Sequence, residues 1–159
     1  DSSSQASERV VNQMLTEMDG LDANKQLFVV AATNRPDMID PAMLRPGRLD
    51  KLLFVPLPTA EAREDILRKA TRAMPLAEGV SLAAIARDAR CQGFSGADLS
   101  ALAREAAVGA LRGCVGSESP RVSLGHFEAA FLHVFPSVSP EDEMSYRRTA
   151  EKLRAARTR

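Results

Sequence analysis

Residues 31–58 read AATNRPDMIDPAMLRPGRLDKLLFVPLP, and this stretch decides how the chain is divided. It overlaps the end of one unbroken apolar run, Leu27–Ala32, and contains a second, Leu52–Val55. Short apolar runs without alternation are typical of strands that are buried on both faces of a parallel sheet. Between them, Asp40 and the proline after it are typical of the cap and first turn of a short helix ending near Arg45. We therefore expect an α/β segment here.

The residues before this stretch are predicted to form a loop and one helix. Asp1–Ser7 is polar and rich in serine, which favours a loop, and apolar residues then recur at helical spacing from Val10 until Gly20. One helix cannot cover both faces of a parallel sheet. We expect the missing strands in another part of a longer protein, or in a second chain.

The residues after Pro58 have the pattern of an all-helical region. Five hydroxyl residues each stand before a helical pattern, where an N-cap is expected: Thr59, Ser81, Ser95, Ser123 and Ser139. Asp98 completes a capping-box pattern with Ser95. The prediction is an α/β portion over residues 1–58, followed by an all-α portion of four to five helices over residues 59–159.

The composition argues against several classes of partner. The chain has 159 residues with 21 basic and 21 acidic side chains, so it lacks the broad positive field that attracts nucleic acid or anionic lipid. We expect no direct nucleic-acid binding and no membrane association. Cys91 and Cys114 have no metal-binding spacing and are typical of thiols in a reducing, intracellular compartment. The basic end of the chain favours a solvated helix face, with a site for an acidic partner as the alternative.

Asn34 is a candidate ligand-binding residue because it follows a predicted buried strand. Open α/β sheets bind ligands at the carboxyl ends of their strands, and a carboxamide can donate a hydrogen bond to phosphate and orient a water molecule. The alternative is a simple turn residue, since Asn, Pro and Asp are common in turns.

Arg45 and Arg48 lie at one corner of the chain. The proline after Arg45 favours an extended backbone there, and Gly47 permits a tight bend. Guanidinium groups match phosphate oxygens, and an arginine from a neighbouring subunit can accelerate phosphoryl transfer by ~10³ or more. The alternative is a surface ion pair between Arg48 and Asp50 or Asp40.

Three segments together resemble the second half of an AAA ATPase module of the valosin-containing-protein type: MLTEMDGLD, residues 31–58 and GFSGADLSALAREAA. The segments LRPGRLDK and HFEAAFLHVFPSVSPEDEMSY are most similar to the second ATPase module of the nuclear valosin-containing protein-like ATPases. The resemblance implies the end of the parallel sheet of a P-loop NTPase, followed by a helical lid. It also implies a nuclear or nucleolar homo-hexamer that remodels proteins or pre-ribosomal particles with the help of adaptors.

The resemblance also implies roles for single residues. Asn34 matches sensor 1, which positions the attacking water, and Arg45 and Arg48 match the arginine fingers that act on nucleotide in the adjacent subunit. Residues 19–21 match a segment that signals between subunits, and residues 2–9 match a loop that lines the central pore.

Four further positions match the nucleotide-facing surface of the lid: Ile66 and Ala70 beside the adenine, and Gly96 and Ala97 in the sensor-2 region. The family often has histidine where Ala70 stands, so the adenine contact at that position departs from the family pattern. Many more distant relatives have arginine in the sensor-2 region, where this chain has Gly-Ala-Asp.

Two motifs that hold ATP do not occur in the sequence. It contains no G-x-x-x-x-G-K-[ST] pattern, and no apolar run ends in an Asp-Glu pair. The full-length protein is expected to use ATP and Mg²⁺, whereas this chain alone is predicted neither to bind ATP tightly nor to hydrolyse it, and no metal site is expected. The alternatives are a helical docking or regulatory domain derived from an AAA protein, or a proteasomal or microtubule-severing relative.

Overall fold

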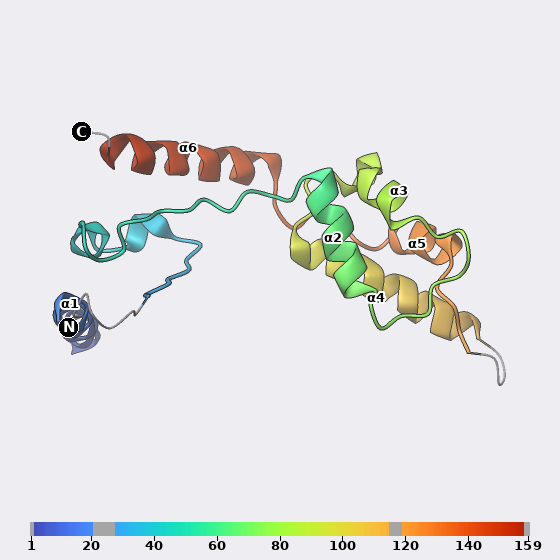
Figure 1. Cartoon of the computed structure of the whole chain (residues 1–159), viewed down its shortest axis with the longest axis horizontal. Coiled ribbons are helices and arrows are strands. Elements are labelled where there is room, and N and C mark those ends of the chain that lie inside the picture. The colour runs from blue at the N-terminus through green and yellow to red at the C-terminus, as the bar shows by residue number, and fades with distance from the viewer. Residues whose placement is uncertain (1, 21–27, 115–118, 158–159) are drawn as a thin grey trace. The chain divides into compact units, whose positions relative to one another are not determined.

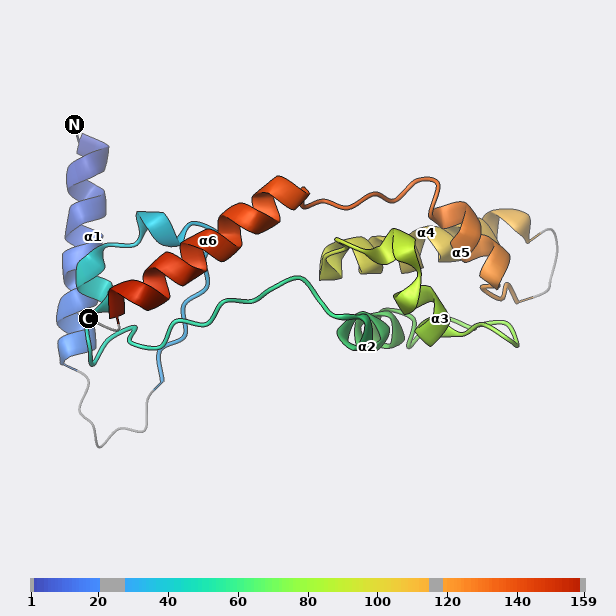
Figure 2. The same ribbon diagram turned by 90° about the horizontal axis from the view of Figure 1, so that it is seen from above.

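The structure is a computed structural model that describes residues 2–20, 28–114 and 119–157. The chain forms two compact units. The first comprises Asp1–Phe54 with Glu151–Arg159, and the second comprises Val55–Ala150. Figures 1 and 2 show the elements of both units from two directions. None of the helices in the described residues is long and apolar enough to cross a membrane.

The five helices predicted after Pro58 are confirmed (Figure 1). Thr59 and Ser81 cap their helices as expected, since each hydroxyl oxygen accepts a hydrogen bond from the amide three residues later, at 3.3 and 3.2 Å. The Ser139 hydroxyl likewise accepts from the Asp142 amide at 3.0 Å. The helices are α2 (Ala60–Ala70), α3 (Leu82–Arg87), α4 (Gly96–Gly113), α5 (Leu124–Ala130) and α6 (Pro140–Arg157).

The hydrophobic core of the described residues lies in the second unit and is centred on α4. This helix contacts both α2 and α5, and α3 packs against α2 (Figure 2). On α4, Leu99, Leu102 and Ala106 have no exposed surface. The small alanine side chains let neighbouring elements approach closely, and burial of the larger side chains stabilises the unit by removing apolar area from water. The other buried apolar residues are Leu67, Ile85, Ala86, Cys91, Phe94, Ala103, Ala110, Val122, Phe127, Ala130 and Phe131.

The first unit contains α1 (Ser2–Asp19), two short 3₁₀ helices, η1 (Pro36–Met38) and η2 (Pro41–Leu44), and the C-terminal part of α6 from Glu151. The short helix predicted after Asp40 is confirmed as η2. The loop predicted over Asp1–Ser7 is wrong from Ser2 onward, as is the loop expected over residues 2–9, because α1 starts at Ser2. The hydrogen bonds of a helix do not require apolar side chains, so α1 extends N-terminal to the apolar spacing. Asp1 lies outside the described residues.

The two predicted strands are not formed, and the described residues contain no strand. Residues 28–33 and 51–58 have no regular structure. Phe28, Val30 and Leu53 are 89, 91 and 89% exposed, where the apolar pattern predicts burial. A strand needs a partner for its N–H and C=O groups, and the described residues provide none for these two segments. Leu27 lies outside the described residues. The helical part of the fold prediction is therefore confirmed, and the sheet part is not.

Candidate functional site

Asn34 lies at a bend that follows residues 28–33, which have no regular structure. The bend is held locally, because the Arg35 amide donates a hydrogen bond to Thr33 Oγ1 at 2.9 Å and the Arg35 guanidinium pairs with Asp37 at 2.9 Å. The Asn34 side chain is exposed, and no described residue forms a hydrogen bond with it. Its carboxamide is therefore free to donate to, or accept from, a group outside this unit.

The corner that carries both arginines is built from backbone hydrogen bonds. Asp40 caps η2 by accepting from the Ala42 amide at 2.8 Å, and the Leu49 amide donates to the Met43 carbonyl at 3.0 Å. Gly47 has a φ of +87°, a conformation that favours glycine, which permits the bend predicted there. Arg45 has the extended backbone expected before proline, with φ of −69° and ψ of 155°.

The two arginines of this corner differ in their contacts. The Arg48 guanidinium donates to Asp19 Oδ1 through Nε and to the Ala42 carbonyl through Nη1, both at 2.6 Å. The hydrogen bonds between them lower the pKa of Asp19 and raise the pKa of Arg48, so the pair stays ionised. Arg45 is exposed, and its side chain forms no hydrogen bond or ion pair among the described residues.

Arg48 does form an ion pair, but with a different carboxylate from the two that the sequence suggested. The carboxylate that binds Arg48 is Asp19, which lies 29 residues earlier in the chain, and neither Asp50 nor Asp40 takes that position. No local spacing pattern could have identified a pair so far apart. Asp19 belongs to the segment matched to inter-subunit signalling, whose last residue, Leu21, lies outside the described residues.

The four predicted lid positions lie on two helices of the second unit. Ile66 and Ala70 are half-buried on α2, whereas Gly96 and Ala97 form the first turn of α4. A Cβ built on Gly96 would lie 3.8 Å from Ile66 Cδ1, so Ile66 and Gly96 are neighbours. The first backbone N–H groups of a helix have no partner within the helix and can bind an oxygen-rich ligand. The structure therefore brings an apolar side chain and a helix N-terminus together.

Asp98 is a buried carboxylate at the same end of α4. It forms the predicted capping box with Ser95, whose hydroxyl oxygen accepts from the Asp98 amide at 3.2 Å. Asp98 also accepts two hydrogen bonds from Ser137, a residue that no sequence pattern singles out. Burial alone would raise the pKa of Asp98, but the hydrogen bonds from Ser95 and Ser137 outweigh this and keep the pKa below its ordinary value.

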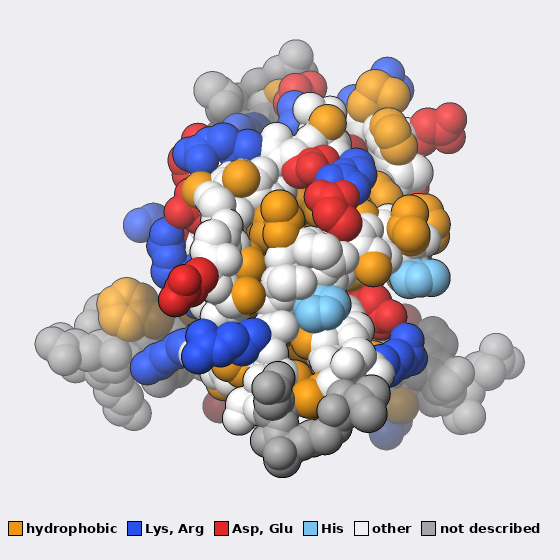
Figure 3. Space-filling view, turned by 90° about the vertical axis from the view of Figure 1, so that its right-hand side faces the viewer, with side chains coloured by type: hydrophobic (Ala, Val, Ile, Leu, Met, Phe, Trp, Pro, Cys, Tyr) orange, Lys and Arg blue, Asp and Glu red, His pale blue; other side chains and the backbone are white. Residues whose placement is uncertain are grey.

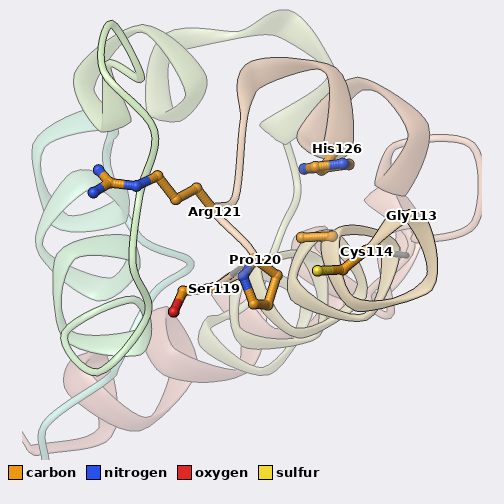
Figure 4. Close-up of a pocket in the computed structure, with 7 residues that line it drawn as sticks. Gly113, Cys114, Ser119, Pro120, Arg121 and His126 are labelled. Carbon is orange, nitrogen blue, oxygen red and sulfur yellow. The ribbon is translucent and has the colours of Figure 1, made fainter. Parts of the chain in front are cut away.

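A separate hollow of about 550 Å³ lies at the other end of α4 (Figure 4). None of the predicted site residues lines it. His126 is fixed there, because its Nδ1 accepts from the Ser123 amide at 3.0 Å. The lining residues are Ala110, Gly113, Cys114, Ser119, Pro120, Arg121 and His126.

The charged groups among the described residues of the second unit form no metal site. Acidic, basic and hydrophobic side chains are interspersed on the face shown in Figure 3. Within residues 2–20, 28–114 and 119–157, no group of His, Cys, Asp and Glu side chains could hold a metal ion.

Two family models match the chain. The model of the ATPase family associated with various cellular activities (AAA) matches residues 1–57, and the AAA+ lid domain matches residues 79–128. The chain belongs to the AAA family. The resemblance inferred from residues 31–58 and from the α4 segment is thereby confirmed, and this AAA chain carries a segment of the ATPase domain followed by a lid.

Curated relatives refine this assignment. The AAA chain is 54% identical, over 89% of its length, to the nuclear valosin-containing protein-like protein of Mus musculus. It is 42% identical, over 94% of its length, to the ribosome biogenesis ATPase RIX7 of Saccharomyces cerevisiae. It is also 51% identical, over 99% of its length, to an AAA domain-containing protein of Schizosaccharomyces pombe. The chain spans about a fifth of the length of these relatives.

Proposed function

We propose that this chain supplies the end of the α/β core, residues 1–58, and the helical lid, residues 59–159, of an ATP-hydrolysing AAA module. Asn34 acts as sensor 1, which positions the attacking water and senses the γ-phosphate. Arg45 and Arg48 act as arginine fingers on nucleotide bound by the adjacent subunit of a homo-hexamer. The observation that carries the proposal is the exposed Arg45 side chain on a hydrogen-bonded corner, within the residues matched by the AAA model.

In this proposal the two arginine fingers have different contacts before they reach the nucleotide. Arg45 can reach a neighbouring phosphate without breaking a contact to a described residue, whereas Arg48 must first leave Asp19. The Asp19 side chain of this pair is exposed, so water and salt screen its attraction to Arg48. Exchanging Asp19 for another anionic partner therefore costs little free energy. Asp19 thus holds Arg48 until a neighbouring nucleotide is present.

In the full-length protein, ATP and Mg²⁺ bind mainly to residues outside this chain, since the sequence has neither the phosphate-binding loop nor the Asp-Glu strand end. From this chain, Ile66 and Ala70 lie beside the adenine, and the backbone at Gly96 and Ala97 lies against the nucleotide. The isolated chain does not bind ATP tightly and does not hydrolyse it.

The names of the relatives support a role in ribosome assembly. One is called nuclear and another a ribosome biogenesis ATPase. We infer that the full-length protein remodels pre-ribosomal particles in the nucleus or nucleolus, with protein substrates and adaptors as its partners. The charge balance of this chain supports contacts with protein rather than with nucleic acid.

The test introduces Arg45→Ala and Arg48→Ala, one at a time, into the full-length protein. Each change is expected to lower kcat for ATP by ~10³-fold, because a cation that stabilises transition-state charge is lost. ATPase rate and ring size are measured together. Lys51→Ala is the matched control, since Lys51 is an exposed cation three positions after Arg48 and its side chain forms no hydrogen bond or ion pair among the described residues.

An unchanged ATPase rate in intact rings would contradict the arginine-finger assignment. It would favour a docking or regulatory role for the helical unit instead. Loss of rings in either variant would show that the arginine is needed for assembly, and single-turnover rates on the remaining rings then decide whether it also acts in catalysis.

A further inference from the structure

One oxygen atom joins two distant parts of the second unit. Asp98 Oδ2 accepts hydrogen bonds from the Ser95 amide and hydroxyl, both at 2.8 Å. The same oxygen accepts from the Ser137 amide at 3.1 Å and from the Ser137 hydroxyl at 2.9 Å. Ser95 is the cap of α4, whereas Ser137 lies 39 residues after Asp98, in the segment that leads into α6.

These contacts are more than a helix cap requires. A capping box needs only the side chain at the cap and the side chain three residues later, and both contacts are present between Ser95 and Asp98. Ser137 adds two further donors from a segment without regular structure. Asp98 is only 7% exposed, and a buried carboxylate that loses donors costs more free energy than an exposed one.

The location of these contacts suggests a role beyond stability. Gly96 and Ala97 lie between Ser95 and Asp98 in the chain, so a shift of the Asp98 carboxylate moves the backbone of this turn. On the other side, α6 begins at Pro140, only three positions after Ser137. The Asp98 carboxylate, together with the contact between the Ser95 and Ser137 hydroxyls at 3.2 Å, therefore connects the segment entering α6 to the first turn of α4.

We propose that Asp98 and Ser137 are positioning residues for nucleotide: their contact holds the first turn of α4 in the geometry that binds ATP and makes that geometry depend on the segment entering α6. This inference rests on the proposed function of Gly96 and Ala97. Neither Asp98 nor Ser137 touches the nucleotide in this mechanism. Both act through the backbone of the turn, so their effect is on the affinity for ATP rather than on the chemical step.

The test compares Ser137→Ala with Ser145→Ala in the full-length protein. Ser137→Ala removes the hydroxyl hydrogen bond to Asp98 and the hydroxyl contact with Ser95 at 3.2 Å, and it leaves the Ser95–Asp98 cap in place. Ser145→Ala is a matched control, because it removes an exposed serine hydroxyl from α6 with which no described residue forms a hydrogen bond. KM for ATP, kcat and the dissociation constant of a fluorescent ATP analogue are measured well below the unfolding temperature.

Ser137→Ala is expected to raise KM and the dissociation constant about 3- to 10-fold with kcat nearly unchanged, since binding depends on the turn and the chemistry does not. Ser137→Thr keeps the amide and a hydroxyl and is expected to retain wild-type values. Ser137→Asp places a second carboxylate against Asp98 and is expected to weaken binding further. Ser145→Ala is expected to leave KM unchanged, although both alanine variants lose a hydroxyl.

A KM in Ser137→Ala equal to that of Ser145→Ala would overturn the proposal. An Ala97→Glu variant separates this failure from failure of the proposed function, because a carboxylate at the exposed Ala97 would repel nucleotide phosphates. If Ala97→Glu raises KM and Ser137→Ala does not, only the positioning role is wrong. If neither change raises KM, the nucleotide-facing assignment of this turn is wrong as well.

Discussion

The two units of this chain bury their apolar side chains to very different extents. The second unit encloses Phe94 and Phe127, which are 2 and 0% exposed, within a core built around α4. In the described part of the first unit no residue is buried, and Phe28 and Val30 are 89 and 91% exposed. Both units have apolar segments, so the difference comes from the availability of partners and not from composition. The second unit encloses a core of its own, whereas the described residues of the first unit form neither a sheet nor a core.

This difference separates two kinds of proposed site residue. Asn34 and Arg45 are placed by short-range hydrogen bonds in the poorly buried unit, where local turns set their directions. Gly96 and Ala97 are placed by a helix that rests on the core. The orientation of the first group is expected to depend on neighbours in the assembled protein, and that of the second group on the lid itself.

The comparison is tested most strongly by removing one phenylalanine ring from each unit. Phe127→Ala is expected to lower the free energy of unfolding of the lid by about 3–4 kcal/mol, because it leaves a cavity among buried side chains. Phe28→Ala is expected to change it by less than about 0.5 kcal/mol, because the Phe28 ring is already in water. Urea unfolding followed by helical circular dichroism measures both. Equal losses in the two variants would show that Phe28 is buried in solution.

The features predicted correctly from sequence are those whose causes are local. A hydroxyl residue before an apolar helical pattern identified the starts of α2, α3 and α4, since a cap and its amide partner are only three residues apart. The proline and glycine around Arg45 gave the backbone of the arginine corner for the same reason. Five helices after Pro58 and the short helix after Asp40 were therefore predictable.

The features that were missed or wrong depend on distant residues. Arg48 binds Asp19, and Asp98 binds Ser137, across 29 and 39 positions that no spacing pattern connects. The buried-strand pattern of Leu52–Val55 describes what a strand requires when a sheet is present, and the described residues do not supply that sheet. The pattern of apolar side chains thus indicates which environment suits a segment. Whether the segment has that environment depends on neighbouring strands and helices that the pattern does not reveal.

An acidic pH titration provides a second, smaller comparison. In the lid, hydrogen bonds from Arg90 lower the pKa of Asp88 from 3.8 to about 2, and Arg90 also pairs with Glu128 on α5 at 2.7 Å. Because the pKa is lower in the folded state, the unfolded chain binds more protons as pH falls, and the stabilisation is lost between pH 3.8 and about 2. This stabilisation of the folded state amounts to about 1–2 kcal/mol at neutral pH.

Asp88→Asn is therefore expected to lower the free energy of unfolding of the lid at pH 7. Between pH 3.8 and about 2, that free energy is expected to change less with pH than in the wild type, as measured by thermal unfolding at a series of pH values. Asp37→Asn is the control from the first unit. The pKa of Asp37 is also lowered by an arginine, Arg35, but both side chains are exposed and lie outside the core. If Asp37→Asn flattens the acid dependence as much as Asp88→Asn does, stability is not concentrated in the lid.

The smallest expected effect comes from the helix caps Asp40 and Ser81. It tests whether the shorter hydrogen bond is also the one that contributes more to folding. Asp40 accepts from the Ala42 amide at 2.8 Å, whereas Ser81 accepts from the Ala84 amide at 3.2 Å, so distance alone would rank Asp40 as the more important cap. Ser81, however, caps α3, whose Ile85 and Ala86 belong to the core, and η2 contains no buried residue. Loss of a cap from a helix that is coupled to a core costs about 0.5–1 kcal/mol.

Ser81→Ala is thus expected to lower the unfolding midpoint of the lid, and Asp40→Ala is expected to leave that midpoint unchanged despite the shorter hydrogen bond. Calorimetry of the two variants decides between the explanations, because a larger shift in Asp40→Ala would mean that the corner carrying Arg45 unfolds cooperatively with the lid.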